Sequence, residues 1–271
     1  MKIFIALFMT LSLVACDLDE LFNATTDTIQ TGLSEGDIVE GLKEALRVGT
    51  DSSISVLGVA DGYFADEAVK ILLPPEANAI LKYKDDDAFK ALGLAKKFDD
   101  LTLGINRAAE WAVDSTGPIF YSAIFDSMTI TDGLAILNGN DTSATHYLKM
   151  NTFTSLSNLF YPYMDQALSI NFIGDFTPKG LWTDITVNYN KAANLYNSGI
   201  AITNALGTTN LTPYEVVSNT DLTSWTTNKG LTGIFLKVGE QEALIRHDPI
   251  ARVTDILEKV FGSVTDNTAT K

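Results

Sequence analysis

Two groups of charged residues in this 271-residue chain could carry chemistry. Arg107 and Glu110 are three residues apart in a segment with helical spacing, so they lie on one helix face. A carboxylate beside a cation can act as a general acid or base without a metal. The sequence therefore admits a metal-independent enzyme that uses Glu110 or Asp132 with Arg107, Arg246 or Arg252.

A solvated helix surface is the simpler explanation of the first group. Together with Asn106, the charged residues Arg107 and Glu110 lie opposite an apolar stripe, which is the usual place for polar side chains on a helix. Leu103 points the same way and Trp111 flanks the group, so another segment could cover this side. The charged pair would then be partly desolvated, as ion pairs are in functional sites and in structural networks alike.

The C-terminal charges have a comparably simple explanation. Arg252 and Asp255 are spaced i, i+3, and Asp255 and Lys259 are spaced i, i+4, both of which are ordinary pairings on a helix surface. Arg246 and Arg252 could instead bind a carboxylate or a phosphate, because a guanidinium matches the geometry of either group. We favour an internal salt-bridge network.

Known catalytic motifs are weak in this sequence. Residues 32–36 match the G-x-S-x-G pattern of a nucleophile elbow, but that turn needs a buried strand before it, and residues 26–31 do not have the apolar pattern of one. Ser34 is better explained as a helix cap. His146 and His247 lack the spacing of metal ligands. We therefore expect no catalytic residue of a known motif, no metal site and no cofactor.

The single cysteine lies at the end of an apolar N-terminal run. Met1 and Lys2 precede the run over residues 3–15, which is too short to cross a bilayer as a helix. The sequence Leu13-Val14-Ala15-Cys16 looks like a bacterial lipobox. That resemblance implies a signal peptide over 1–15, lipid attachment at Cys16, and a polar tether over 16–33. An ordinary cleaved signal with an incidental cysteine is the alternative.

The formal charge of −15 limits the partners of this protein. Cleavage after Ala15 would remove one lysine and no acid, leaving −16. Nonspecific nucleic-acid binding needs clustered basic residues, so nucleic acid is excluded as a partner. Hydrophobic residues make up 46% of the chain, which excludes a disordered polyelectrolyte. One cysteine excludes an internal disulfide.

Hydrophobic spacing predicts an all-α fold in one multi-helix domain over residues 34–262. Ser34 and Asp37 match a capping box at the first helix. The clearest stripe predicts a helix over 94–113. We also expect a break at 138–141, a helix over 249–262 with one apolar face, a long Thr/Asn-rich loop near 197–228 and a disordered tail over 263–271. Ten aromatic residues between Tyr147 and Tyr196 could line an apolar pocket or pack a core.

An ordered series of short strings resembles the bacterial DUF4197 family over about residues 33–262. The strings are Gly41 to Leu46, Asn106 to Glu110, Met128-Thr129 with Asp132, Ile136 to Gly139, Ala144-Thr145 with Tyr147, Gly233 to Phe235, and Ile245 to Gly262. The resemblance implies a helical envelope protein without assigned catalytic residues. It marks recurring polar positions, which are Asn106, Arg107, Glu110, Asp132, Arg246, Arg252 and Asp255. The segment 197–219 departs from the family pattern.

These observations favour an exported, lipid-anchored protein of the cell envelope, facing the periplasm or the cell surface. We expect it to act as a binding or interaction module for an apolar small ligand or another envelope protein. A metal-independent enzyme and a purely structural envelope component remain the alternatives.

Overall fold

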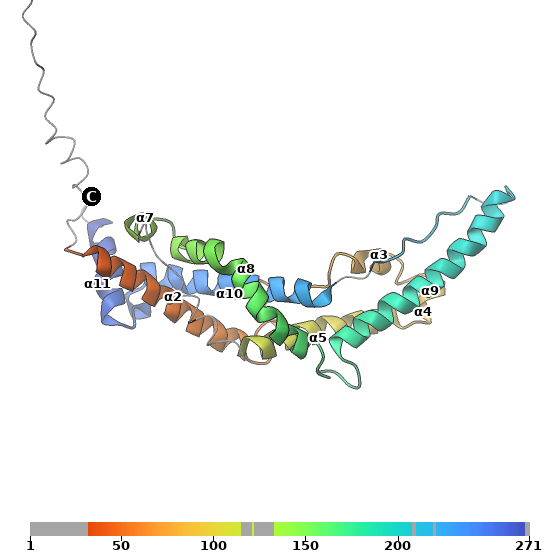
Figure 1. Ribbon diagram of the computed structural model, residues 1–271, viewed down its shortest axis with the longest axis horizontal. Coiled ribbons are helices and arrows are strands. Elements are labelled where there is room, and N and C mark those ends of the chain that lie inside the picture. Colours follow the sequence, from red (N-terminus) through yellow and green to blue (C-terminus); the bar gives the residue numbers. More distant parts are fainter. Residues whose placement is uncertain (1–31, 115–120, 122–132, 208–209, 219–220, 269–271) are drawn as a thin grey trace, which may run out of the picture. The chain divides into compact units, whose positions relative to one another are not determined.

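All regular secondary structure in the described part of the chain is helical, which confirms the all-α expectation. The computed structural model describes residues 32–114, 121, 133–207, 210–218 and 221–268 (Figure 1). The chain divides into residues 1–34 and 35–271, and every described helix belongs to the second unit. The helices are α2 (Glu35–Leu57), α3 (Ala77–Leu81), α4 (Asp87–Lys90), α5 (Leu94–Asp114), α7 (Gly133–Leu137), α8 (Ser143–Ala167), α9 (Pro178–Ala205), α10 (Leu222–His247) and α11 (Asp255–Thr268), with a 3-10 turn at Pro249–Ala251.

Helix α10 is the centre of the core. It packs against α2 and α8, while α11 lies on α2 and α10 (Figure 1). Two glycines allow side chains of other segments to pack directly against the helix backbone. A β-carbon at Gly233 would lie 2.8 Å from the ring of Tyr63, and one at Gly41 would lie 2.7 Å from Val260. Both glycines belong to the strings described above, so packing explains why a side chain is absent there.

The helix predicted over 94–113 is confirmed as α5. Its apolar positions are all buried, namely Leu94, Phe98, Leu101, Ile105, Ala108 and Ala112. The predicted start after Ser34 and the break at 138–141 are also confirmed, since α2 begins at Glu35 and α8 at Ser143. None of the helices in the described ranges is both long enough and apolar enough to cross a membrane.

The long loop expected near 197–228 is shorter than predicted. Helix α9 continues to Ala205 and α10 begins at Leu222, so only residues 206–221 connect them. The prediction was wrong because asparagine favours turns in isolation. On α9, Asn190, Asn197 and Asn204 instead have a structural task.

These three asparagines hold the return segment 210–218 against α9. The amide of Asn197 donates to the carbonyl of Tyr214 at 2.8 Å and accepts from its N–H at 2.7 Å. Asn190 pairs with Val217, and Asn204 with Leu211, through the same two bonds. Seven helical residues rise about 10.5 Å, roughly the span of three extended residues, so the two spacings match. We call this arrangement the asparagine ladder.

The C-terminal helix differs from its prediction at both ends. Pro249 begins a 3-10 turn rather than a helix, and α11 starts only at Asp255. Consequently Ile250 and Val253 are exposed instead of sharing the buried face of Leu257. At the other end α11 continues to Thr268, through the first part of the expected tail over 263–271.

Several predicted features lie outside the described residues. They are the signal segment 1–15, Cys16, the tether up to residue 31, and Asp132.

Replacing Asn197 with alanine tests the asparagine ladder. The substitution removes two hydrogen bonds and leaves the backbone N–H and carbonyl of Tyr214 without their side-chain partner. We expect Asn197→Ala to lower the free energy of unfolding in urea by about 1–3 kcal/mol. Asn194→Ala is the matched control, because Asn194 is an exposed residue of the same helix. Equal losses in the two variants would contradict a structural role for the ladder.

Candidate functional site

The predicted polar group on α5 is buried under another segment and is not a solvated surface. Asn106 and Glu110 are buried, and the segment between α2 and α3 covers them. One oxygen of Glu110, Oε1, accepts hydrogen bonds from the backbone N–H groups of Tyr63 and Phe64, each at 3.2 Å. The other, Oε2, accepts from Arg107 at 2.7 Å. Both oxygens of the carboxylate are therefore occupied.

Arg107 and Asn106 also bind the segment between α2 and α3 that covers Glu110. Arg107 donates to Asp61 at 2.8 Å, where the backbone takes the left-handed conformation with φ of 69°. The hydrogen bond to Glu110 is the main reason that the pKa of the Arg107 guanidinium is above its usual value. The hydrogen bond to Asp61 raises this pKa further, while desolvation opposes both. Asn106 accepts from the N–H of Ile71 and donates to its carbonyl, both at 2.8 Å.

A second buried group joins α10 to two helix ends. Glu242 is fully buried and accepts from the N–H groups of Ala144 and Thr145, at the start of α8, at 3.0 and 2.7 Å. Arg246 pairs with Glu242 at 2.8 Å and donates to the carbonyls of Ile136 and Leu137, at the end of α7. A carboxylate at a helix start and a cation at a helix end each complement the unpaired backbone groups there.

Sequence reasoning identified Arg246 but missed Glu242, although the i, i+4 spacing of the two residues was a usable signal.

Arg252 closes the end of α10 instead of pairing with Asp255. It donates to the carbonyls of Ile245 and Arg246 at 3.0 and 3.1 Å, and it also pairs with Glu258 at 3.7 Å. The predicted Asp255 pairings are therefore wrong. Asp255 is exposed at the first position of α11, where an acidic group suits the helix dipole. Lys259 pairs with Asp37 of α2 at 2.8 Å.

The described site residues thus fall into separate networks. Arg107 and Glu110 bind the segment before α3, whereas Arg246 and Arg252 bind the ends of α7 and α10. Within the described ranges, no three His, Cys, Asp or Glu residues are placed to hold a metal ion.

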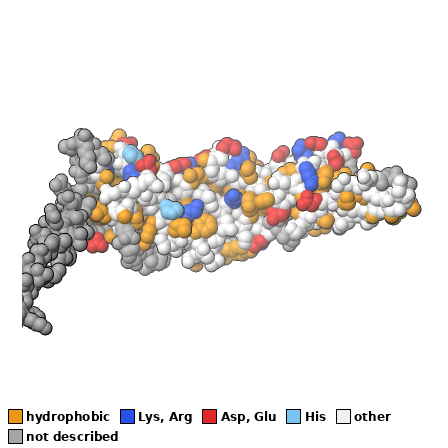
Figure 2. All heavy atoms as spheres, turned by 90° about the horizontal axis from the view of Figure 1, so that it is seen from above, with side chains coloured by type: hydrophobic (Ala, Val, Ile, Leu, Met, Phe, Trp, Pro, Cys, Tyr) orange, Lys and Arg blue, Asp and Glu red, His pale blue; other side chains and the backbone are white. Residues whose placement is uncertain are grey.

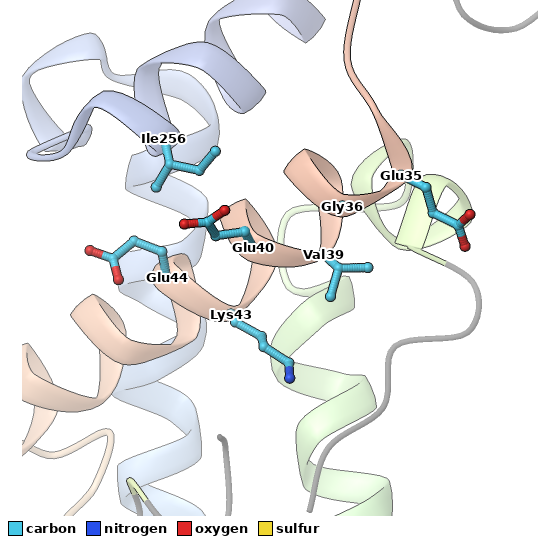
Figure 3. Close-up of a pocket in the computed structure, with 7 residues that line it drawn as sticks. All are labelled: Glu35, Gly36, Val39, Glu40, Lys43, Glu44 and Ile256. Atoms are coloured by element: carbon cyan, nitrogen blue, oxygen red, sulfur yellow. The ribbon is translucent and has the colours of Figure 1, made fainter. Parts of the chain in front are cut away.

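One hollow on the described surface lies over the first turns of α2. It measures about 750 Å³ and is lined by Glu35, Gly36, Val39, Glu40, Lys43, Glu44 and Ile256. Its side chains do not converge. Glu40 and Glu44 point toward the α11 side, while Lys43 and Val39 point away from them (Figure 3). Glu44 is already bound to Arg47 at 2.6 Å, and this hydrogen bond lowers the pKa of the Glu44 carboxyl. This hollow is a poor candidate for a site.

A groove between α8 and α10 is the better candidate. It measures about 480 Å³, a volume typical of small-ligand sites. The α10 side supplies Phe235, Leu236, Gly239 and Ala243, so the floor is largely apolar. Figure 2 shows hydrophobic side chains in patches between charged groups on one face of the molecule. Buried Thr145 lines the groove, and its hydroxyl donates a hydrogen bond to Glu242 at 2.7 Å. The Glu242–Arg246 network therefore holds one side of the groove in place.

Charged groups of both signs stand at the rim of this α8–α10 groove. Its two acids have partners outside the lining set, since Asp141 binds His247 at 2.6 Å and Glu240 binds Lys237 at 2.9 Å. His146 and Lys149 also line the groove, and neither has an ion-pair partner among the described residues. Lys149 is therefore a groove cation without a salt bridge to a described carboxylate, and its ammonium lies 5.7 Å from the centre of the Phe153 ring.

The aromatic residues between 147 and 196 are divided between the core and the surface, and Tyr161 and Phe176 are exposed. Phe160, Trp182 and Tyr189 are buried. Tyr196 lies 4.4 Å from Tyr214, ring to ring, beside the asparagine ladder. Desolvation raises the pKa of Tyr214 to about 12, and its hydroxyl also bonds to Asp86. Core packing is therefore supported for Phe160, Trp182 and Tyr189, and not for all ten aromatics of this segment.

Replacing Glu242 with alanine tests the structural role of this network. The substitution leaves Arg246 buried without its partner and frees two N–H groups of α8. We expect a loss of about 3–5 kcal/mol in the free energy of unfolding, measured with urea. Glu240→Ala removes an exposed acid of the same helix and should cost less than about 1 kcal/mol. A loss for Glu242→Ala as small as that of this control would contradict the assignment.

Comparison with known proteins identifies the family. No curated protein and no solved structure matches the chain. The model of the family described as protein of unknown function (DUF4197) matches residues 32–262, which is most of the chain and agrees with the resemblance described above. The chain belongs to the DUF4197 family.

Proposed function

We propose that this chain is a lipid-anchored protein of the bacterial cell envelope and that its helical domain is a binding module. The lipobox-like sequence ending at Cys16 supports the anchor. Two or more acyl chains hold a protein stably on a bilayer, whereas one chain gives marginal binding. The domain itself contributes no attraction, because a charge of about −16 would be repelled by anionic lipid.

The state of the charged residues favours binding over catalysis. A general acid or base must reach the proton that it transfers. The carboxylate of Glu110 is 5% exposed, and both of its oxygens are engaged. Arg246 and Arg252 are likewise committed to backbone carbonyls. These contacts leave the enzyme alternative without an available group among the described candidates.

The α8–α10 groove is the observation that carries the proposal. Its floor is apolar, and its rim holds His146 and Lys149 without ion-pair partners among the described residues. A ligand that fits this surface has an apolar body and an acidic head. The apolar part would gain about 25 cal/mol for each Å² removed from water, and the head would pair with the lysine.

Laurate is a suitable probe for this groove. We expect the full-length protein to bind laurate below the micellar concentration, and dodecyltrimethylammonium to bind more weakly because its head is cationic. Replacing both His146 and Lys149 with glutamine should weaken laurate binding about fivefold to tenfold, measured by isothermal titration calorimetry. Lys191→Gln is the control, since Lys191 is exposed on α9 and outside the groove.

Two results would count against the ligand-binding part of the proposal. One is the absence of laurate binding together with the absence of any co-purified small molecule, which would favour a purely structural envelope component. The other is an equal loss of affinity in the double variant and in Lys191→Gln.

The anchor has a separate test in labelled cells. We expect radioactive palmitate to enter the wild-type chain and not Cys16→Ala, because Cys16 supplies the only thiol that can receive a diacylglyceryl group. The wild-type chain should also fractionate with the membranes of the envelope. Equal labelling of the two chains would contradict lipid attachment at this residue.

A further inference from the structure

The outer face of α9 carries apolar side chains that nothing in the described structure covers. Leu195, Ile202 and Leu206 are 78%, 64% and 72% exposed. Gly199 lies between them, and nothing stands within 4 Å of a β-carbon built there. The four positions are separated by four, three and four residues, the spacing of a helix-packing seam. We call these residues the α9 seam.

The α9 seam lies in a segment almost free of charge. Residues 185–214 contain Lys191 as their only charged residue and no acid, although the chain carries 34 acids. In Figure 1 the end of α9 extends away from α2 and α8, and the same end of Figure 2 is coloured mainly white and orange. Acidic surfaces of two protein molecules repel each other. The segment that carries the seam therefore brings no carboxylate of its own into a contact between two copies.

The polar residues beside the seam favour a protein partner over a lipid surface. Helices that lie in a membrane interface usually carry lysine and arginine on their polar face. Here the neighbouring polar groups are hydroxyls and amides, with Lys191 as the one cation of the segment. The opposite face of the helix is also taken, because the asparagine ladder holds residues 210–218 against it.

We propose that the α9 seam binds a second copy of this chain in antiparallel orientation, centred on Gly199. In that register the small Ala192 faces the large Leu206 of the other copy, and Leu195 lies beside Ile202. Gly199 faces its own equivalent, where the absent side chain lets the two backbones approach. The seam is thus complementary to itself, as a two-fold interface requires. The arrangement also places the acidic parts of the two copies at opposite ends.

A cysteine at the centre of the seam tests this proposal directly. Gly199 is exposed and open, so Gly199→Cys should leave the fold intact. The full-length variant, extracted in a mild detergent and treated with copper phenanthroline, should form a disulfide-linked dimer on a non-reducing gel. Met150→Cys is the matched control, because Met150 is 71% exposed on α8 and lies outside the seam. Since the natural chain has one cysteine, the wild type gives the background.

A second substitution separates a specific interface from random collision. Ile202→Lys in the Gly199→Cys background places a charge in the seam and should lower the cross-linked fraction about tenfold. Cross-linking of Gly199→Cys no higher than that of Met150→Cys would overturn the proposal. Cross-linking that Ile202→Lys leaves unchanged would overturn it as well. Neither readout depends on lipid attachment or on the α8–α10 groove.

Discussion

The fold depends on buried side chains that satisfy backbone groups where helices stop. A helix end leaves about four N–H or four C=O groups without partners, and an irregular segment leaves more. Burying such a group unpaired costs about 1–3 kcal/mol. In this protein the missing partners are supplied by Glu110, Glu242 and Arg246. The backbone of extended segments is bound instead by Asn106 and by the asparagine ladder. The helices could not pack against these segments otherwise.

This constraint gives a physical meaning to most of the polar positions that the family resemblance marks. Asn106, Arg107 and Glu110 form one clamp across the segment before α3, and Arg246 and Arg252 close the ends of helices. A carboxylate or guanidinium in such a position is demanding about geometry, so few other residues can replace it. Function is then better sought at the surface, in grooves and exposed faces, than among these buried charges.

The sequence was informative about helices and less so about their contacts. The stripe of α5 was readable because its apolar spacing is regular, and the start of α2 because Ser34 is a good cap. The continuation of α9 through Asn197 and Asn204 could not be read from the sequence. These asparagines bind the backbone of a segment outside the helix, and the helical spacing gives no sign of that segment. Burial of Glu110 depends in the same way on a distant segment. A side chain that pairs with backbone leaves no pattern in the partner, because any residue has an N–H and a carbonyl.

Amide hydrogen exchange tests the central claim most directly, because it reports on single backbone groups. The N–H groups of Tyr63, Ile71 and Val217 lie outside helices and bond to side chains of Glu110, Asn106 and Asn190. Our account predicts that these amides exchange as slowly as those inside the neighbouring helices, and that Glu110→Ala releases Tyr63 before the helices open. Exchange at the rate of an unstructured loop in the wild type would contradict it.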